Sequence, residues 1–219
     1  MNAVLQQTLR ITEIFLSLQG EARTVGCPTV FVRLTGCPLR CGYCDTAYAF
    51  TGGELQTFDG ILGQVVSLGV RHVTVTGGEP LAQSGCRALL TALCDAGFAV
   101  SLETSGALDI ADIDARVSVV MDLKTPGSGE VHRNRWENIE RLKVIDQVKF
   151  VVCNRSDYEW SRYKIDEYRL IDRVGDVLLS PVAVNLPPAQ LADWIVADRL
   201  PVRFQLQLHK VLWGDVPGR

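Results

Sequence analysis

The sequence predicts an α/β fold in a single domain, with a parallel β-sheet that carries helices on its outside. Short apolar runs of strand length alternate with amphipathic segments along the chain, which is the pattern of such sheets. No low-complexity tract and no repeat of fixed period interrupts this alternation. The chain has 219 residues, 47% of them hydrophobic, which suits one globular domain with a sizeable core.

Eight segments are predicted to form strands. They are rich in Val, Ile, Leu and Phe, and turn residues lie near their ends. In chain order they are Leu9–Phe15, Thr29–Thr35, His72–Thr76, Ala99–Thr104, Val117–Leu123, Val148–Val152, Val177–Leu179 and Arg203–Leu208.

Four helices are predicted between these strands. The first, Ala82–Ala96, carries Leu89, Leu90 and Leu93 on one face and ends before Gly97, a residue that commonly terminates helices.

The second predicted helix is Arg135–Lys143, whose buried stripe would be Trp136, Ile139 and Leu142. The third and fourth predicted helices are Asp157–Tyr168 and Pro188–Ala197. In the fourth, Pro188 lies in the first turn, where proline favours helix formation.

Composition and charge exclude several classes of protein. The formal net charge of −3 supplies no broad basic surface, so direct binding to nucleic acid is disfavoured. No apolar run is long enough to span a membrane, and Met1–Arg10 lacks the apolar core of a signal peptide. These features predict a cytoplasmic protein. Seven cysteines in such a protein indicate metal binding or catalysis rather than disulfides.

Five polar clusters directly follow predicted strands. In a parallel sheet covered by helices, chemistry gathers at the carboxyl ends of the strands, so these clusters are expected to meet at one edge. They are Gly36–Cys44, Gly77–Pro80, Glu103–Ser105, Asp122–Lys124 and Ser180.

Three cysteines, Cys37, Cys41 and Cys44, lie within eight residues. Thiolates are soft ligands that suit iron–sulfur clusters, zinc or copper(I). Three thiolates can hold one face of a [4Fe–4S] cluster and leave one iron open, whereas a structural zinc site requires four ligands. Spacing alone leaves zinc as an alternative, because further thiols exist elsewhere in the chain. These are Cys27, Cys86, Cys94 and Cys153.

The cysteine spacing resembles the signature of the radical S-adenosylmethionine (SAM) superfamily, with Tyr43 as the aromatic residue before the third cysteine. The segment Gly77–Pro80 resembles the glycine-rich motif of that superfamily, where only glycine lets the backbone approach the SAM amino group closely. The resemblance implies a [4Fe–4S] cluster, SAM as the source of a 5′-deoxyadenosyl radical, and a full or partial (β/α) barrel.

Within the superfamily, the chain resembles the 7-carboxy-7-deazaguanine synthase family over nearly all of residues 1–219. This resemblance implies an abbreviated, partial barrel in a single radical SAM core domain. It also implies a lyase that contracts 6-carboxy-5,6,7,8-tetrahydropterin to 7-carboxy-7-deazaguanine and releases ammonia, on the route to queuosine in transfer RNA. The matching segments are Ile14–Glu21, Phe31–Cys37, Cys44–Thr46, Thr74–Pro80, Glu103–Gly106 and Gln207–Lys210.

The family resemblance assigns residues by position in this sequence. The [4Fe–4S] ligands are Cys37, Cys41 and Cys44, and the Mg²⁺ ligand is Thr46. The residues expected at SAM are Gly78, Glu79, Ser105, Asp122, Leu123, Lys124 and Ser180. The residues expected at the pterin are Leu18, Gln19, Gly20, Arg33, Thr76 and Arg219. The catalytic residues are predicted to be His209, Glu21 and Glu103.

Physical chemistry supports three of these assignments. Arg33 can grip a carboxylate with two hydrogen bonds, and an arginine in an apolar run is costly without a partner, although an outward-facing position is the alternative. Thr46 supplies a hard oxygen donor for Mg²⁺, although Asp45 and Thr46 alone resemble a helix N-cap. His209 titrates in the range that proton transfer requires, although a structural histidine at the end of the sheet is the alternative.

The resemblance further implies a homodimer and reduction by a flavodoxin or ferredoxin. Two other functions stay open from the sequence. One is a different radical SAM enzyme, such as a glycyl-radical activase acting on a protein. The other is a non-catalytic zinc-binding module.

Overall fold

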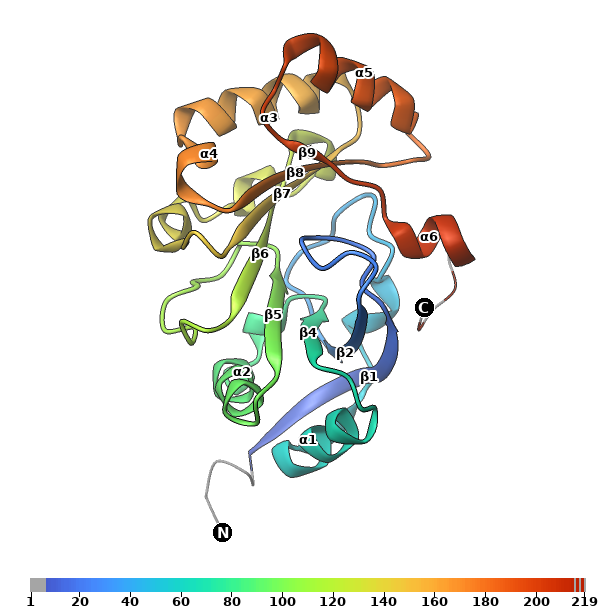
Figure 1. The fold of residues 1–219 in the computed structure, drawn as a ribbon, viewed down its shortest axis with the longest axis vertical. Helices are drawn as coiled ribbons and strands as arrows, with labels where there is room; N and C mark the ends of the chain where they lie inside the picture. Colours follow the sequence, from blue (N-terminus) through green and yellow to red (C-terminus); the bar gives the residue numbers. More distant parts are fainter. Residues whose placement is uncertain (1–6, 215, 217, 219) are drawn as a thin grey trace.

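The computed structural model describes residues 7–214, 216 and 218. Within them, one open sheet contains nine strands in the order β3-β1-β2-β4-β5-β6-β7-β8-β9. The sheet curves around an inner face and carries α1 and α2 at one end and α3, α4 and α5 at the other (Figure 1). The strands are β1 Thr8–Leu18, β2 Pro28–Leu34, β3 Glu54–Thr57, β4 His72–Gly77, β5 Ala99–Thr104, β6 Ser118–Leu123, β7 Gln147–Val152, β8 Asp176–Pro181 and β9 Arg203–Phe204.

The predicted parallel sheet is confirmed from β2 to β9, where every neighbouring pair is parallel. The prediction is wrong at the first edge, because β1 pairs with both β2 and β3 in antiparallel fashion. No helix separates β1 from β2. Residues 19–27 instead form a short return, in which the Gln19 amide donates to the Cys27 carbonyl and the Gly26 amide donates to the Gln19 carbonyl. A short return of this kind joins antiparallel strands.

The helices cover the outer face of the sheet. Thr57 caps α1 by accepting a hydrogen bond from the Gly60 amide, and this helix was not predicted. The α2 helix begins at Cys86 rather than at the predicted Ala82, because the preceding residues form a 3₁₀ turn, η2. The α-helices are α1 Phe58–Ser67, α2 Cys86–Asp95, α3 Arg155–Glu167, α4 Leu170–Arg173, α5 Pro188–Asp198 and α6 Leu208–Trp213, and η2 is Pro80–Ala82.

The predicted helix Arg135–Lys143 is wrong, because its middle forms a 3₁₀ helix, η5 (Trp136–Arg141). Asn138 in this segment is fully buried, and its amide nitrogen donates to the carbonyl oxygens of Gly106 and Leu108. Its side-chain oxygen accepts from the Ile110 amide. These bonds to a distant loop fix the segment in a tight conformation that a sequence pattern does not reveal.

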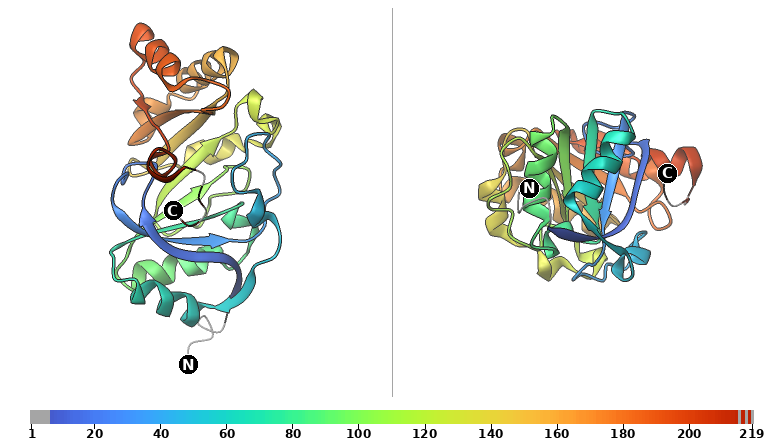
Figure 2. Two further views of the ribbon diagram at one scale, coloured as in Figure 1. Left: turned by 90° about the vertical axis from the view of Figure 1, so that its right-hand side faces the viewer. Right: turned by 90° about the horizontal axis from the view of Figure 1, so that it is seen from below.

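The predicted last strand, Arg203–Leu208, is also too long. Only Arg203–Phe204 pairs with β8, and Leu208 begins α6 instead. The Leu208 amide donates to the Gly20 carbonyl at 2.9 Å, which draws the chain away from the sheet edge. As a result α6 lies beside the segment that joins β1 and β2 (Figures 1 and 2).

Two hydrophobic clusters fill the space between sheet and helices. One joins β1, β2, β4 and β5 to α1 and α2, and the other joins β6, β7 and β8 to α3 and α5. The inner face of the sheet holds a much smaller apolar cluster, Ala22, Val120 and Leu178. Burying the apolar residues on the outer face leaves the inner face free for polar side chains. No helix in the described part of the chain has the length and apolar character needed to cross a membrane.

Candidate active site

A cavity of about 600 Å³ lies on the inner face, where the carboxyl ends of the parallel strands meet. Each of the five polar clusters predicted to meet at one edge contributes to its lining, which confirms that prediction. The contributing residues include Cys37, Gly78, Ser105, Lys124 and Ser180. A parallel sheet places residues that follow successive strands side by side, which explains why clusters far apart in the sequence converge here.

The three clustered cysteines line this cavity, and the other four do not. Cys86 and Cys94 are buried on α2, and Cys153 is buried after β7. A tetrahedral zinc site needs a fourth ligand, and none of the other four thiols reaches the cavity that the three clustered cysteines line. Three thiols around an open cavity fit an iron–sulfur cluster with one iron left for a small molecule.

Hydrogen bonds fix the loop that carries the cysteines. The Gly42 amide donates to the Ser128 carbonyl, and the Arg40 amide donates to the Glu130 carboxylate at 2.6 Å. The Arg40 guanidinium donates to the Cys37 carbonyl at 2.8 Å. The segment after β6 therefore holds the cysteine loop against the mouth of the cavity.

The loop also rests directly on the end of β4. A Cβ atom added to Gly78 would lie 2.5 Å from the Cβ atom of Cys37 and 2.5 Å from the Gly36 carbonyl oxygen. The Glu79 amide donates to the same carbonyl at 2.9 Å. Glycine at position 78 is what permits this contact between the two segments.

Two residues predicted at SAM lie outside the cavity lining. Leu123 is fully buried in the outer hydrophobic cluster, because strand alternation turns its side chain away from Asp122 and Lys124. Glu79 is fully buried as well, and its carboxylate accepts hydrogen bonds from Thr104 and from the amide and hydroxyl of Ser105. Glu79 therefore holds the end of β5 in place rather than facing the cavity.

A wall of charged side chains follows β6 and β7. Lys124 lies 3.2 Å from Asp122, and Lys149 lies 2.6 Å from Glu21. Burial opposes the charge of Lys124, but Asp122 and Cys41 together outweigh that effect and raise the pKa of the lysine. One Asp122 carboxylate oxygen and the Tyr43 hydroxyl are buried without a hydrogen-bond partner among the described residues. An unpartnered buried acceptor on this wall fits a bound molecule that donates hydroxyl or amino hydrogens, as SAM does.

Arg33 points into the cavity, so the outward-facing alternative is wrong. Its guanidinium bonds the Glu13 carboxylate at 2.6 Å and lies over the rings of Phe15 and Tyr48. The Tyr48 hydroxyl donates to the same carboxylate at 2.8 Å. These contacts orient the arginine while the cavity side of its planar group stays available to a carboxylate.

Thr46 lines the cavity beside the cysteines, immediately before a 3₁₀ helix, η1 (Ala47–Phe50). It occupies the N-cap position but makes no capping hydrogen bond, and its hydroxyl instead donates to Asp45 at 2.8 Å. Lys210 pairs with the other Asp45 oxygen at 2.7 Å. The alternative that the Thr46 side chain caps a helix is therefore wrong. The Thr46 hydroxyl and the Asp45 carboxylate instead form a pair of oxygen donors that fits a hard cation.

The C-terminal segment closes one side of the cavity. A Cβ atom added to Gly20 would collide with the ring of His209, so glycine at this position allows the histidine to pack against the β1–β2 segment. Gln207 donates to Glu21 at 2.6 Å. Burial lowers the pKa of His209, which leaves its imidazole mainly neutral near pH 7.

The predicted pterin residues other than Arg219, which lies outside the described residues, gather in this cavity. Gln19 donates to Glu103 at 3.4 Å, and Thr76 donates to the other Glu103 oxygen at 3.0 Å. Burial and the charge of Glu21 raise the pKa of Glu103. The lining residues among the predictions are Leu18, Gln19, Gly20, Glu21, Arg33, Thr76, Glu103 and His209.

Among the polar lining residues, Lys149 and Gln207 were not predicted, and neither was Glu13, which lies outside the lining but holds Arg33. Lys149 interrupts an apolar strand, Val148–Val152, so the argument used for Arg33 applies equally to it. Glu13 lies in β1, where it pairs with Arg33 on β2, and it carries no comparable signal. Gln207 lies in a segment predicted as strand, where its orientation could not be inferred.

The amino-acid sequence of this chain is similar to those of known proteins. A model of the radical SAM superfamily matches residues 31–151. The chain is 43% identical to the 7-carboxy-7-deazaguanine synthase of Chlorobaculum tepidum, over 94% of this chain and 94% of that protein. It is 39% identical to the enzyme of the same name from Koribacter versatilis, over 94% of this chain and 97% of that protein.

Solved structures share the fold. QueE from Escherichia coli superposes with a TM-score of 0.74 at 24% identity, covering 92% of this chain and 95% of that chain. Streptococcus suis SuiB bound to S-adenosylmethionine superposes with a TM-score of 0.56 at 17% identity, covering 78% of this chain and 45% of that chain. The open α/β sheet is thus a fold that this chain shares with both solved structures.

Proposed function

Because the chain belongs to the radical SAM superfamily and, within it, to the 7-carboxy-7-deazaguanine synthase family, we propose that it contracts 6-carboxy-5,6,7,8-tetrahydropterin to 7-carboxy-7-deazaguanine with release of ammonia. It is a carbon–nitrogen lyase on the route to queuosine. The observation that carries the proposal is one cavity lined both by three clustered cysteines and by Arg33, Gln19 and Glu103. Membership of this family decides against the glycyl-radical activase and the zinc-binding module.

The cofactors of this function match the donors in the cavity. Cys37, Cys41 and Cys44 would hold a [4Fe–4S] cluster, and the cavity wall around Gly78, Ser105, Asp122, Lys124 and Ser180 would hold SAM. When bound, this pair supplies a carbon radical able to remove a hydrogen atom from the substrate. The unpartnered Asp122 oxygen would accept a hydrogen bond from SAM.

The chain's own residues bind and orient the pterin. Arg33, held by Glu13, binds the substrate carboxylate with its free edge. Gln19, Thr76 and Glu103 form a connected set of hydrogen-bonding groups that suits the polar edge of a pterin ring. The neutral imidazole of His209 can take up or return a proton at the ring.

The experiment that tests this function uses anaerobically reconstituted protein with SAM, a reductant, Mg²⁺ and the carboxypterin. We expect deazaguanine product and an equal amount of ammonia. Protein with an intact cluster that cleaves SAM but forms no deazaguanine would contradict the proposed ring contraction. Membership of the radical SAM superfamily would still stand.

A Mg²⁺ ion is part of the proposal, with Thr46 as its protein ligand. The hydroxyl of Thr46 and the Asp45 carboxylate provide hard oxygen donors at the cavity, and substrate oxygens and water would complete the shell. The electron donor is proposed to be a flavodoxin or ferredoxin, and the enzyme is proposed to act as a cytoplasmic homodimer.

Replacing Thr46 with alanine is expected to raise the Mg²⁺ concentration needed for half-maximal activity by about tenfold or more, because one metal ligand is lost. Thr46→Ser keeps the hydroxyl and should stay near wild type. The measurement is initial rate against Mg²⁺ concentration, with iron content as the control. Equal Mg²⁺ dependence in the alanine and serine variants would contradict Thr46 as the ligand.

A further inference from the structure

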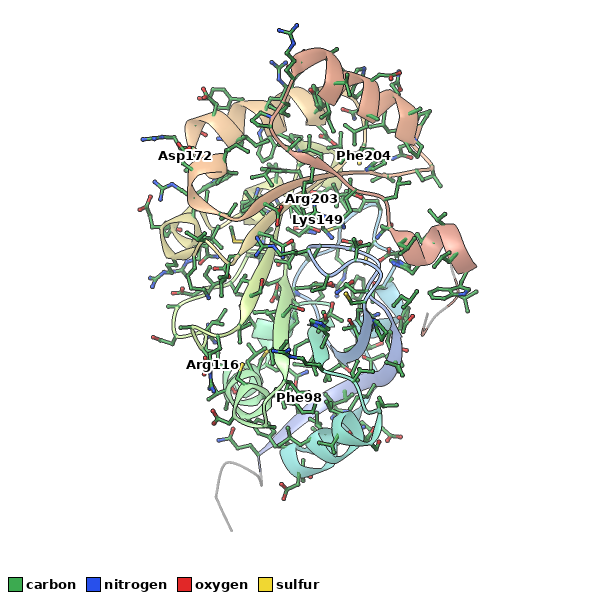
Figure 3. All side chains as sticks on the ribbon, in the orientation of Figure 1. Phe98, Arg116, Lys149, Asp172, Arg203 and Phe204 are labelled. Carbon is green, nitrogen blue, oxygen red and sulfur yellow. The ribbon has the colours of Figure 1, made fainter. Side chains whose placement is uncertain are left out.

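Lys149 lies in the middle of β7, near the centre of the molecule (Figure 3). In the parallel sheet it is level with Asp122 on β6 and Leu178 on β8. Its side chain is only 13% exposed and lines the cavity. Burying an ammonium group in the interior of a sheet is costly unless it is paired, so its partners indicate its role.

Those partners are two carboxylates from different parts of the chain. The Lys149 ammonium donates to one oxygen of Glu21 at 2.6 Å, and it lies 3.4 Å from Asp122. Burial alone would lower the pKa of Lys149, but Glu21 and Asp122 raise it well above its ordinary value. The two carboxylates therefore favour the charged form of Lys149 in the cavity wall.

Glu21 is held at both oxygens. Gln207 donates to the oxygen that Lys149 does not reach, at 2.6 Å. The Glu21 amide in turn donates to the side-chain oxygen of Gln19 at 3.1 Å, and the Gln19 amide nitrogen donates to Glu103. A continuous path of direct contacts thus runs from Lys149 through Glu21 and Gln19 to Glu103, which faces the proposed pterin position.

Burial and the charge of Glu21 raise the pKa of Glu103, so these two carboxylates repel each other. Lys149 supplies a positive charge beside Glu21 that offsets this repulsion. Other charged or titratable groups face the same region from the surrounding elements. They are Asp122 and Lys124 from the end of β6, Glu103 from β5, Arg33 from β2, Cys37, Cys41, Tyr43, Cys44 and Asp45 from the segment after β2, and His209 and Lys210 from α6.

We propose that Lys149 is a positioning residue for the ring contraction, which holds the Glu21 carboxylate in place through its charge and hydrogen bond so that the Gln19–Glu103 pair keeps its place at the substrate. The inference rests on the proposed function for its substrate. It assigns Lys149 an electrostatic role, not a contact with the reacting atoms. An isosteric but neutral side chain would fill the same space and leave Glu21 without its cation.

The test compares Lys149→Met with Lys149→Arg in the reconstituted enzyme. For the methionine variant we expect about 100-fold lower kcat and unchanged iron content. The loss of a cation raises the pKa of nearby carboxylates, so the pH below which activity falls should move upward by about one. Arginine keeps the charge and should restore that pH to its wild-type value.

A second readout does not depend on turnover. Infrared difference spectra of the reconstituted proteins, recorded across pH, follow the band of protonated carboxyl groups, and Glu21→Gln identifies the share of Glu21. Lys149→Met should show a protonated Glu21 at a pH where the wild type shows carboxylate. An unshifted Glu21 titration, or an arginine variant as impaired as methionine, would overturn the inference. If the wild type forms no deazaguanine, the proposed function fails, and the infrared titration still decides the role of Lys149.

Discussion

Gly78→Ala is expected to disable the enzyme by displacing the cysteine loop. The added Cβ atom would lie 2.5 Å from both the Cys37 Cβ atom and the Gly36 carbonyl oxygen, which is closer than such atoms approach in folded proteins. Because one of these contacts is to backbone, no side-chain rotation can relieve it. Cys37 must move, and a displacement of about 1 Å at a reacting site costs roughly 100-fold in rate.

The measurements are iron and sulfide content after reconstitution, and the rate of SAM cleavage. We expect both to fall in Gly78→Ala. Gly42→Ala is the matched control, because Gly42 lies in the same loop and a Cβ atom there meets nothing within 4 Å. Its amide still donates to Ser128, so this variant should retain its cluster and its activity. A Gly78→Ala enzyme with wild-type cluster content and rate would show that the contact is not restrictive.

Glu79→Ala is expected to destabilise the fold by about 3–5 kcal/mol, because it leaves several buried hydrogen-bond donors without an acceptor. The Glu79 carboxylate accepts from the Leu81 amide at 3.0 Å and from the Ser105 amide at 2.7 Å. It also accepts from the hydroxyls of Thr104 and Ser105. A loss of this size is a large fraction of the stability of a typical domain.

Urea unfolding followed by circular dichroism measures this effect as a change in the free energy of unfolding. Glu137→Ala is the control, because its side chain is 74% exposed and its removal should change stability by less than about 0.5 kcal/mol. Glu79→Gln keeps one acceptor oxygen but turns an amide nitrogen towards the same donors, so it should fall between the two. A Glu79→Ala protein within about 1 kcal/mol of wild type would contradict the structural role.

Much of the site could be predicted because its residues follow strands. The apolar runs defined β4, β5, β6 and β8 closely, and a parallel sheet then requires the polar segments after them to converge. A different argument supported Arg33, which the family resemblance assigned to the substrate carboxylate: a charged side chain inside an apolar run is costly without a partner. That argument applies equally to Lys149, which lies in a similarly apolar run.

The predictions failed where distant contacts override local pattern. The segment around Asn138 has the apolar spacing of a helix, yet bonds to the loop at residues 106–110 hold it as a 3₁₀ helix. Leu208 ends an apolar run, yet its hydrogen bond to Gly20 starts α6 instead of extending a strand. Glu79 belongs to a motif expected at SAM, yet its carboxylate turns into the core.

By itself, the sequence determined the alternation of strands and helices, the three-cysteine loop and the side of the sheet where chemistry gathers. These follow from local spacing, which depends on residues close together in the chain. Only the tertiary structure decided that Lys149, Gln207 and Glu21 form one network, because 128 residues separate Glu21 from Lys149 and 186 separate it from Gln207. Such contacts depend on the curvature of the sheet and on the path of the chain across its inner face, and neither is encoded in any single segment.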